Sequence, residues 1–248
     1  MAMDTPVPSD EKEGVLIPDG LDDTLEVENY IASHPLAVSL RENVDFRETR
    51  ANAAIPEGLR PRTLTSGTLA GLDKITVSPF LFNEADGKSL VSIFHLGTDV
   101  CGHPGIVHGG LLATLLDEGL ARCCFPAMPN KVAVTANLNI DYRRPAMADS
   151  YLALKARTIK VEGRKAWVEG HIETLPENGK EPVLLVEAKA LFIEPKQAAV
   201  SFPQKKKKKK KQLIALLMFL SFCRLWLLST SRMFRRTLAL SFLSLFFM

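Results

Sequence analysis

The chain of 248 residues has only four cysteines, and their spacing matches neither a metal site nor a disulfide framework. Cys123 and Cys124 are adjacent, while Cys101 and Cys223 stand alone, so no Cys-x-x-Cys pair is present. Thiols of this kind usually pack as small hydrophobic groups. We therefore expect no bound metal, no cysteine nucleophile and a reducing, intracellular compartment.

The first residues lack the features of a targeting signal. Residues 1–14 contain no apolar core segment, which argues against a secretory signal, and no Arg-rich amphipathic pattern, which gives a mitochondrial transit peptide little support. Residues 1–23 are rich in Pro, Asp and Glu, a composition typical of disordered segments. The sequence leaves a cytoplasmic and a mitochondrial location open.

Positive charge is scarce over most of the chain. Of the 31 Lys and Arg residues, 11 lie in residues 205–248, whereas all 28 Asp and Glu residues precede them. The first 204 residues therefore carry a net charge of about −8. A folded surface of this sign repels phosphate groups, so we expect no binding to nucleic acid.

Residues 198–248 form a separate low-complexity tail, in which seven lysines (Lys205–Lys211) precede a stretch dominated by Leu, Phe and Ser. A membrane span needs about 20 mostly apolar residues, and residues 212–228 offer 17, interrupted by Arg224. Three interpretations stay open: a membrane anchor, a segment that binds anionic membrane surfaces, and translation beyond the true end of the gene near Lys196. We favour the third, because the predicted domain is complete before the lysines.

The remaining chain divides into an N-terminal extension, 1–73, and a domain, 74–197. Residues 25–49 favour one or two short helices, broken at Ser33-His34-Pro35, and residues 50–73 are rich in Gly and Pro, which predicts an irregular connection. The extension is thus expected to be partly disordered, with short helices.

The domain begins with two β-rich runs, 75–82 and 88–96, and the Asp86-Gly87 pair between them predicts a hairpin. A helix follows over 109–124. Four further strands are predicted at 131–143, 151–161, 165–174 and 183–193. One long helix and about six antiparallel strands predict an α+β fold in which the sheet wraps around the helix.

Asp117 stands out, because it is a carboxylate within an otherwise apolar helix, where burial without a partner is costly. At 100° per residue it shares a face with the small or polar residues Gly110, Thr114 and Ala121. The opposite face is hydrophobic and consists of Leu111, Leu112, Leu115 and Leu116. An alternative stays open, in which Asp117 or Glu118 merely pairs with Arg122.

The helix begins with His108-Gly109-Gly110, and the first N–H groups of a helix have no partner within it. Glycines allow a substrate carbonyl to approach these N–H groups, which then act as an oxyanion hole; the alternative is an ordinary glycine-rich turn. Gly109 and Asp117 are eight residues apart, about 12 Å along a helix, too far to act on one carbonyl. We therefore predict a dimer with composite sites.

Three segments carry a resemblance to a known family: GIVHGGLLATLLDEGLAR, AVTANLNIDYRRP and KVEGRKAWVEGHI. Together they resemble the hotdog-fold acyl-CoA thioesterase superfamily, in the branch of thioesterase superfamily member four and its fungal relatives, which is itself similar to the PaaI-type enzymes. The resemblance covers about residues 75–195 and implies the hotdog fold, with the sheet wrapped around the central helix.

The resemblance also implies roles for single residues. Asp117 matches the general base or nucleophile, and the Gly109 N–H matches the donor that polarises the thioester carbonyl. Thr135 resembles the residue that orients the attacking water, and His108 resembles the histidine that shapes the carbonyl site. Some PaaI-type relatives have Asn or Asp where this chain has Gly102. The polar contact that this side chain makes in those relatives is therefore in doubt here.

The implied reaction is hydrolysis of an acyl-CoA thioester to free acid and coenzyme A, without a cofactor, by a homodimer or a dimer of dimers. Gly110, Arg143, Arg144 and Arg164 are candidates for substrate binding, the arginines for the phosphates of coenzyme A. The alternative is a non-catalytic hotdog module that binds acyl-CoA or lipid and is tethered to a membrane by residues 205–248. A hydratase is disfavoured, because no Asp-x-x-x-x-His pattern is present.

Overall fold

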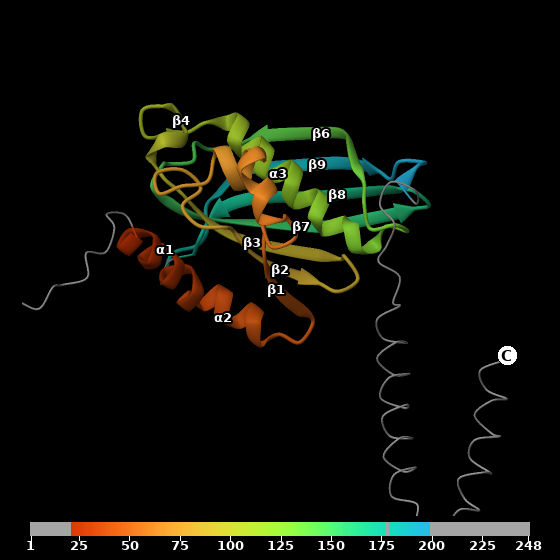
Figure 1. The fold of residues 1–248 in the computed structure, drawn as a ribbon, viewed down its shortest axis with the longest axis horizontal. Coiled ribbons are helices and arrows are strands. Elements are labelled where there is room, and N and C mark those ends of the chain that lie inside the picture. The colour runs from red at the N-terminus through yellow and green to blue at the C-terminus, as the bar shows by residue number, and fades with distance from the viewer. Residues whose placement is uncertain (1–20, 177–178, 199–248) are drawn as a thin grey trace, which may run out of the picture. The chain divides into compact units, whose positions relative to one another are not determined.

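The computed structural model describes residues 21–176 and 179–198. They form one large antiparallel sheet with a long helix across one face (Figure 1). The strand order is β1-β2-β3-β7-β8-β9-β6. The bounds are β1 (Phe46–Arg50), β2 (Phe80–Glu84), β3 (Ser89–Leu96), β6 (Val134–Tyr142), β7 (Ser150–Glu162), β8 (Lys165–Thr174) and β9 (Leu184–Ile193).

The central helix α3 (Gly109–Cys124) begins and ends where the sequence predicts. Its leucines pack against β3, β7 and β8, and the deepest of them, Leu116 and Leu120, are completely buried. Close packing of β8 against β7 depends on Gly170 in β8, because a Cβ atom there would lie 2.6 Å from the carbonyl oxygen of Lys155 in β7. The predicted α+β hotdog arrangement, a sheet wrapped around one long helix, is confirmed.

The seventh strand, β1, differs from the sequence prediction. Helices α1 (Leu21–Ser33) and α2 (Pro35–Glu42) confirm the predicted helices and the break between them, where His34 caps α2. The predicted helical region to residue 49 is wrong at its end, because residues 46–50 pair with β2 instead. Alternate residues of β1 are half-buried, so pairing with a neighbouring strand outweighs the weak local preference of this short segment.

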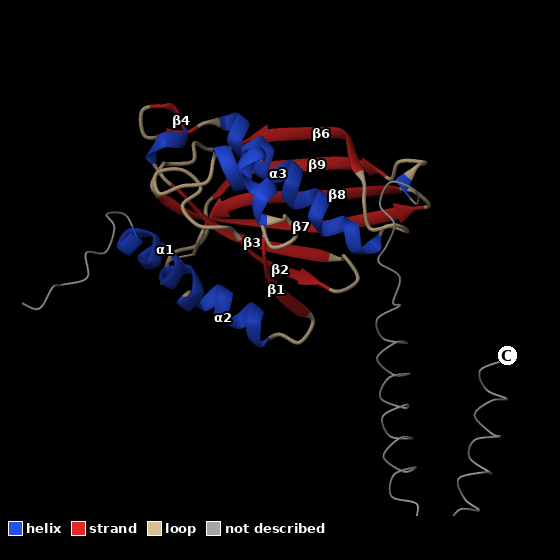
Figure 2. Ribbon diagram, viewed as in Figure 1, coloured by secondary structure: helices blue, strands red, loops and turns tan. Residues whose placement is uncertain are grey.

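Helices α1 and α2 cover the face of the sheet opposite to α3. Val27 and Ile31 of α1 share a second core with Phe80, Phe82 and Ile93, whereas the alternate residues of β3 face α3. Figure 2 shows these helices apart from α3, beside β1, β2 and β3. The outer face of the β6, β8 and β9 region has no helix over it among the described residues.

Short elements complete the described chain. The predicted irregular connection contains two helical turns, η1 (Glu57–Arg62) and η2 (Leu64–Thr68), and a third, η3 (Thr98–Val100), follows β3. A small hairpin, β4 (Cys101–His103) and β5 (Ile106–Val107), leads into α3, and η4 (Phe125–Ala127) follows it. The described residues include no helix with the length and hydrophobicity that a bilayer crossing demands. The predicted disordered lead-in falls mostly, and the tail almost wholly, outside the described residues.

Candidate active site

Asp117 and Thr135 come together in the structure. Asp117 projects from α3 toward the edge strand β6, where the Thr135 hydroxyl donates a hydrogen bond of 2.6 Å to Asp117 Oδ1. In the single chain Asp117 is half-buried rather than fully buried, because this side of α3 faces the open edge of the sheet. The carboxylate is therefore both held by a hydroxyl and accessible.

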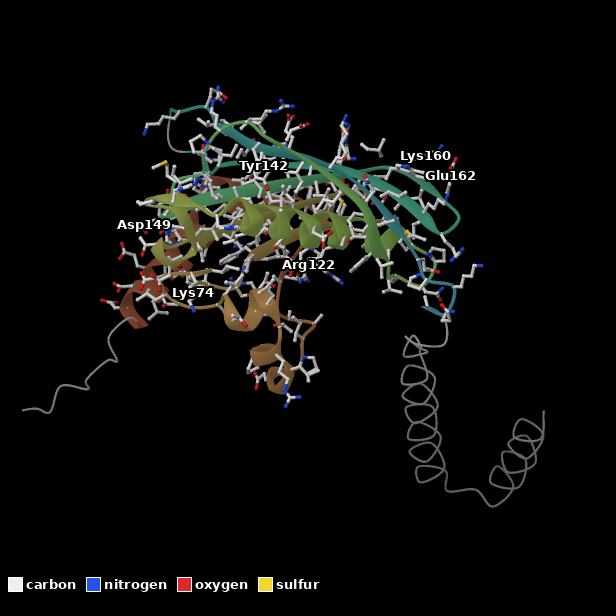
Figure 3. All side chains as sticks on the ribbon, turned by 90° about the horizontal axis from the view of Figure 1, so that it is seen from above. Lys74, Arg122, Tyr142, Asp149, Lys160 and Glu162 are labelled. Atoms are coloured by element: carbon white, nitrogen blue, oxygen red, sulfur yellow. The ribbon has the colours of Figure 1, made fainter. Side chains whose placement is uncertain are left out.

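The neighbouring carboxylate, Glu118, has a structural role. It accepts hydrogen bonds from Thr65 of η2 at 2.9 and 3.1 Å and lies 3.5 Å from Arg122. The alternative ion pair with Arg122 therefore applies to Glu118, not to Asp117. Figure 3 shows Arg122 and Tyr142 on opposite sides of α3, so this network is separate from the side that faces β6.

The first turn of α3 leaves one N–H group free. His108 caps the helix, and its Nδ1 accepts a hydrogen bond of 2.9 Å from the Gly110 N–H. The Leu111 N–H donates to the His108 carbonyl, also at 2.9 Å. Within residues 21–176 and 179–198, the Gly109 N–H has no acceptor, so it remains available to a ligand oxygen.

Tyr142, at the end of β6, contacts the same turn. Its hydroxyl donates a hydrogen bond of 2.8 Å to the Gly109 carbonyl. A Cβ atom on Gly109 would lie 3.3 Å from the Tyr142 ring, and one on Gly110 would lie 2.9 Å from the His108 ring. Tyr142 is not among the site residues predicted from the sequence, although it lies in the segment AVTANLNIDYRRP that carries the family resemblance.

A cavity of about 470 Å³ opens beside this turn. It is lined by the β4–β5 hairpin, the start of α3 and the end of β6, including His103, His108, Gly109, Tyr142 and Arg144. A larger hollow of about 630 Å³ lies on the outer face of the sheet and includes neither Gly109 nor Asp117. Because the smaller cavity contains the free N–H group, it is the candidate site.

The three predicted arginines are not gathered in one place. Arg143 lines the cavity, but its guanidinium is bound to Glu187 at 2.7 Å and to Asp141 at 3.5 Å. Arg144 lines the same cavity and has no ion pair among the described residues. Arg164 follows β7, and the strand register places it at the Val134 end of β6, away from Arg144.

The buried cysteines have the properties of core residues. Burial raises the pKa of Cys123 to about 11 and that of Cys124 to about 12. Thiols with such values are poor nucleophiles at neutral pH. The described part of the chain contains no group of three or more His, Cys, Asp or Glu residues that fits a metal ion.

Known proteins are similar to the part of the chain that contains α3 and β6. A family model described as the thioesterase superfamily matches residues 104–179. An uncharacterized mitochondrial protein of Candida albicans (strain WO-1) is 35% identical over 153 residues, which are 61% of this chain and 69% of that protein. The acyl-coenzyme A thioesterase THEM4 of Mus musculus is 40% identical over 107 residues, 43% of this chain and 44% of its own length.

Among solved structures, the chain is similar to a thioesterase superfamily protein with 30% identity and a TM-score of 0.41. The match covers 50% of this chain and 61% of that one. The chain thus spans less than half the length of the mouse relative and about two thirds of the fungal one.

Proposed function

The chain belongs to the thioesterase superfamily, and from this premise we propose that it hydrolyses acyl-CoA thioesters to a free acid and coenzyme A. The name of the mouse relative, an acyl-coenzyme A thioesterase 40% identical to this chain over 107 residues, supports this substrate class. The observation that carries the proposal is the hydrogen bond from Thr135 to the accessible carboxylate of Asp117.

In the proposed reaction, Asp117 acts as the general base or the nucleophile. As a base, it takes a proton from a water molecule that the Thr135 hydroxyl oxygen helps to orient. The water oxygen then attacks the thioester carbonyl, and the coenzyme A thiolate leaves. The Gly109 N–H stabilises the negative charge on the carbonyl oxygen, as an oxyanion-hole donor does.

The two parts of this site come from different protomers in the proposal. Gly109 and Asp117 lie at separate turns of α3, about 12 Å apart along its axis. β6 is an edge strand on which Val134 and Tyr142 are each 54% exposed. Pairing of two β6 edges about a two-fold axis sets the glycine end of one α3 beside Asp117 of the other. The same pairing brings Arg144 and Arg164 from opposite protomers toward one coenzyme A.

Replacing the carboxylate tests the mechanism. Asp117→Ala is expected to lower kcat by at least about a hundredfold, because general-base catalysis contributes that much, while acyl-CoA binding persists. Glu118→Gln is the matched control, since it changes the adjacent carboxylate and is expected to keep nearly full activity. Thiol release across a panel of acyl-CoA chain lengths measures both. An unchanged rate in Asp117→Ala would refute the assigned role of Asp117.

The alternative function is acyl-CoA binding without hydrolysis. It predicts that the wild-type protein binds acyl-CoA in calorimetry yet releases no thiol with any chain length, so the same panel separates the two functions.

We also propose a mitochondrial location, supported by the name of the Candida relative. Fractionation or imaging of the tagged full chain checks it.

A further inference from the structure

The peptide group between Gly109 and Gly110 is held at both ends. Its carbonyl oxygen accepts the hydrogen bond of 2.8 Å from the Tyr142 hydroxyl, and its N–H donates the hydrogen bond of 2.9 Å to His108 Nδ1. One partner comes from the cap of α3 and the other from β6, 33 residues beyond Gly109. Neither glycine has a side chain that would fix this turn.

This restraint bears on the neighbouring N–H group. The Gly109 N–H belongs to the preceding peptide, whose direction depends on the backbone torsions of Gly109. Glycine restricts those torsions least of all residues, and first turns of helices fray. A donor stabilises a developing charge best when its direction is set before the reaction begins. The Tyr142 hydrogen bond supplies such a restraint from outside the helix.

We propose that Tyr142 is a positioning residue that holds the carbonyl of Gly109 and thereby aims the Gly109 N–H at the thioester oxygen. This inference rests on the proposed function. In this role Tyr142 acts through the backbone of Gly109 and not directly on the reacting atoms.

The placement of Tyr142 is consistent with this role. In the single chain Tyr142 is 54% exposed, so packing within the chain explains little of why its ring lies over Gly109. Its strand also carries Thr135, which contacts Asp117. β6 therefore holds both functional parts of α3, the carboxylate through Thr135 and the glycine end through Tyr142.

Tyr142→Phe removes the hydroxyl and keeps the ring. Loss of one neutral hydrogen bond corresponds to a change of about five- to tenfold, so kcat is expected to fall by about that factor while KM stays within about twofold. The pH dependence of kcat keeps its shape, because Asp117 is unaltered. Tyr30→Phe is the matched control: Tyr30 lies on α1, on the opposite face of the sheet, and its variant is expected to retain wild-type kinetics.

A second measurement does not depend on activity. Hydrogen exchange of the Gly110 amide, followed by NMR in the full chain labelled with nitrogen-15 glycine, is expected to be several-fold faster in Tyr142→Phe and unchanged in Tyr30→Phe. Wild-type kcat together with wild-type exchange in Tyr142→Phe would overturn the proposal, as would a lower kcat with unchanged exchange. If the wild-type protein hydrolyses no acyl-CoA, the proposed function fails, and exchange alone decides whether Tyr142 holds this peptide.

Discussion

Gly109 contributes a backbone N–H, not a side chain, to the proposed reaction. Gly109→Pro removes this N–H at the first helical position, where proline is well tolerated. We expect kcat to fall by about a hundredfold or more, the usual cost of losing an oxyanion-hole donor. Gly109→Ala keeps the N–H and places a similar carbon against the Tyr142 ring, so it controls for crowding. Equal losses in both variants would contradict the role of the N–H.

The cysteines differ in predicted reactivity. Because burial raises the pKa of Cys123 to about 11 and that of Cys124 to about 12, the thiolate fraction of each at about pH 8 is on the order of one in a thousand or less. Among the cysteines of the described residues, Cys101 is only half-buried and is expected to react with iodoacetamide before Cys123 and Cys124. Peptide mass spectrometry of the native protein checks this order, and early labelling of Cys123 would contradict it.

His95 links stability to pH. It is 5% exposed, with Nδ1 2.8 Å from Thr76 Oγ1 and Nε2 3.3 Å from Asp149. Its ring is tilted by 55° from that of Tyr151, with the two ring centroids 4.6 Å apart. Desolvation lowers the pKa of His95, and Asp149 offsets part of this shift. The unfolded chain, with a His pKa of about 6.5, then binds more protons below that value, so stability falls on acidification.

The expected consequence is a Tm that decreases between about pH 7 and pH 5.5. His95→Gln is expected to make the decrease of Tm with falling pH shallower, because it removes the imidazole that binds a proton more readily in the unfolded chain than in the folded one. Differential scanning calorimetry of both proteins provides the comparison. Parallel curves of Tm against pH for the two proteins would show that His95 does not contribute to the pH dependence of stability.

At the scale of elements, close contact between strands at Gly170 limits substitution. A Cβ atom at this position meets the Lys155 carbonyl oxygen at 2.6 Å and the Ala156 Cα at 3.1 Å, both of them backbone atoms. Gly170→Ala is therefore expected to lower the free energy of unfolding by about 2 kcal/mol. Gly58→Ala, where nothing lies within 4 Å of the added atom, is expected to change it by less than about 0.5 kcal/mol. Urea denaturation measures both.

Elements with a strong periodic pattern were predictable from the sequence, whereas contacts between distant elements were not. The bounds of α3 and β8 follow from their apolar periodicity and the adjoining turns. β1 has only five residues, too few to show a clear alternation. The bond from Tyr142 to Gly109 depends on how β6 crosses α3, which local sequence does not encode. For the site, the family resemblance predicts Asp117 and Thr135, whereas their hydrogen bond depends on the placement of β6 beside α3.

At the scale of the whole molecule, composite sites predict complementation between two inactive variants. In a mixed dimer of Asp117→Ala and Gly109→Pro chains, one of the two sites combines an intact Asp117 with an intact Gly109. Random pairing after joint refolding is expected to restore about a quarter of wild-type activity, since half of the dimers are mixed. Thiol release before and after mixing measures the gain. No gain, or an active monomer in sedimentation, would argue for a site within one chain.

The two edges of the sheet differ in a way that limits the size of the assembly. β6 presents nine residues with an open outer side, whereas β1 presents five, of which Arg47, Glu48 and Arg50 are charged. Arg41 of α2 binds Glu48 at 2.7 Å on this second edge. Short, charged edges resist pairing with other strands. Pairing through β6 therefore leaves only the β1 edge of each sheet exposed, and that edge resists further pairing. The protein is expected to form closed dimers in concentrated solution rather than fibres that lengthen by adding strands.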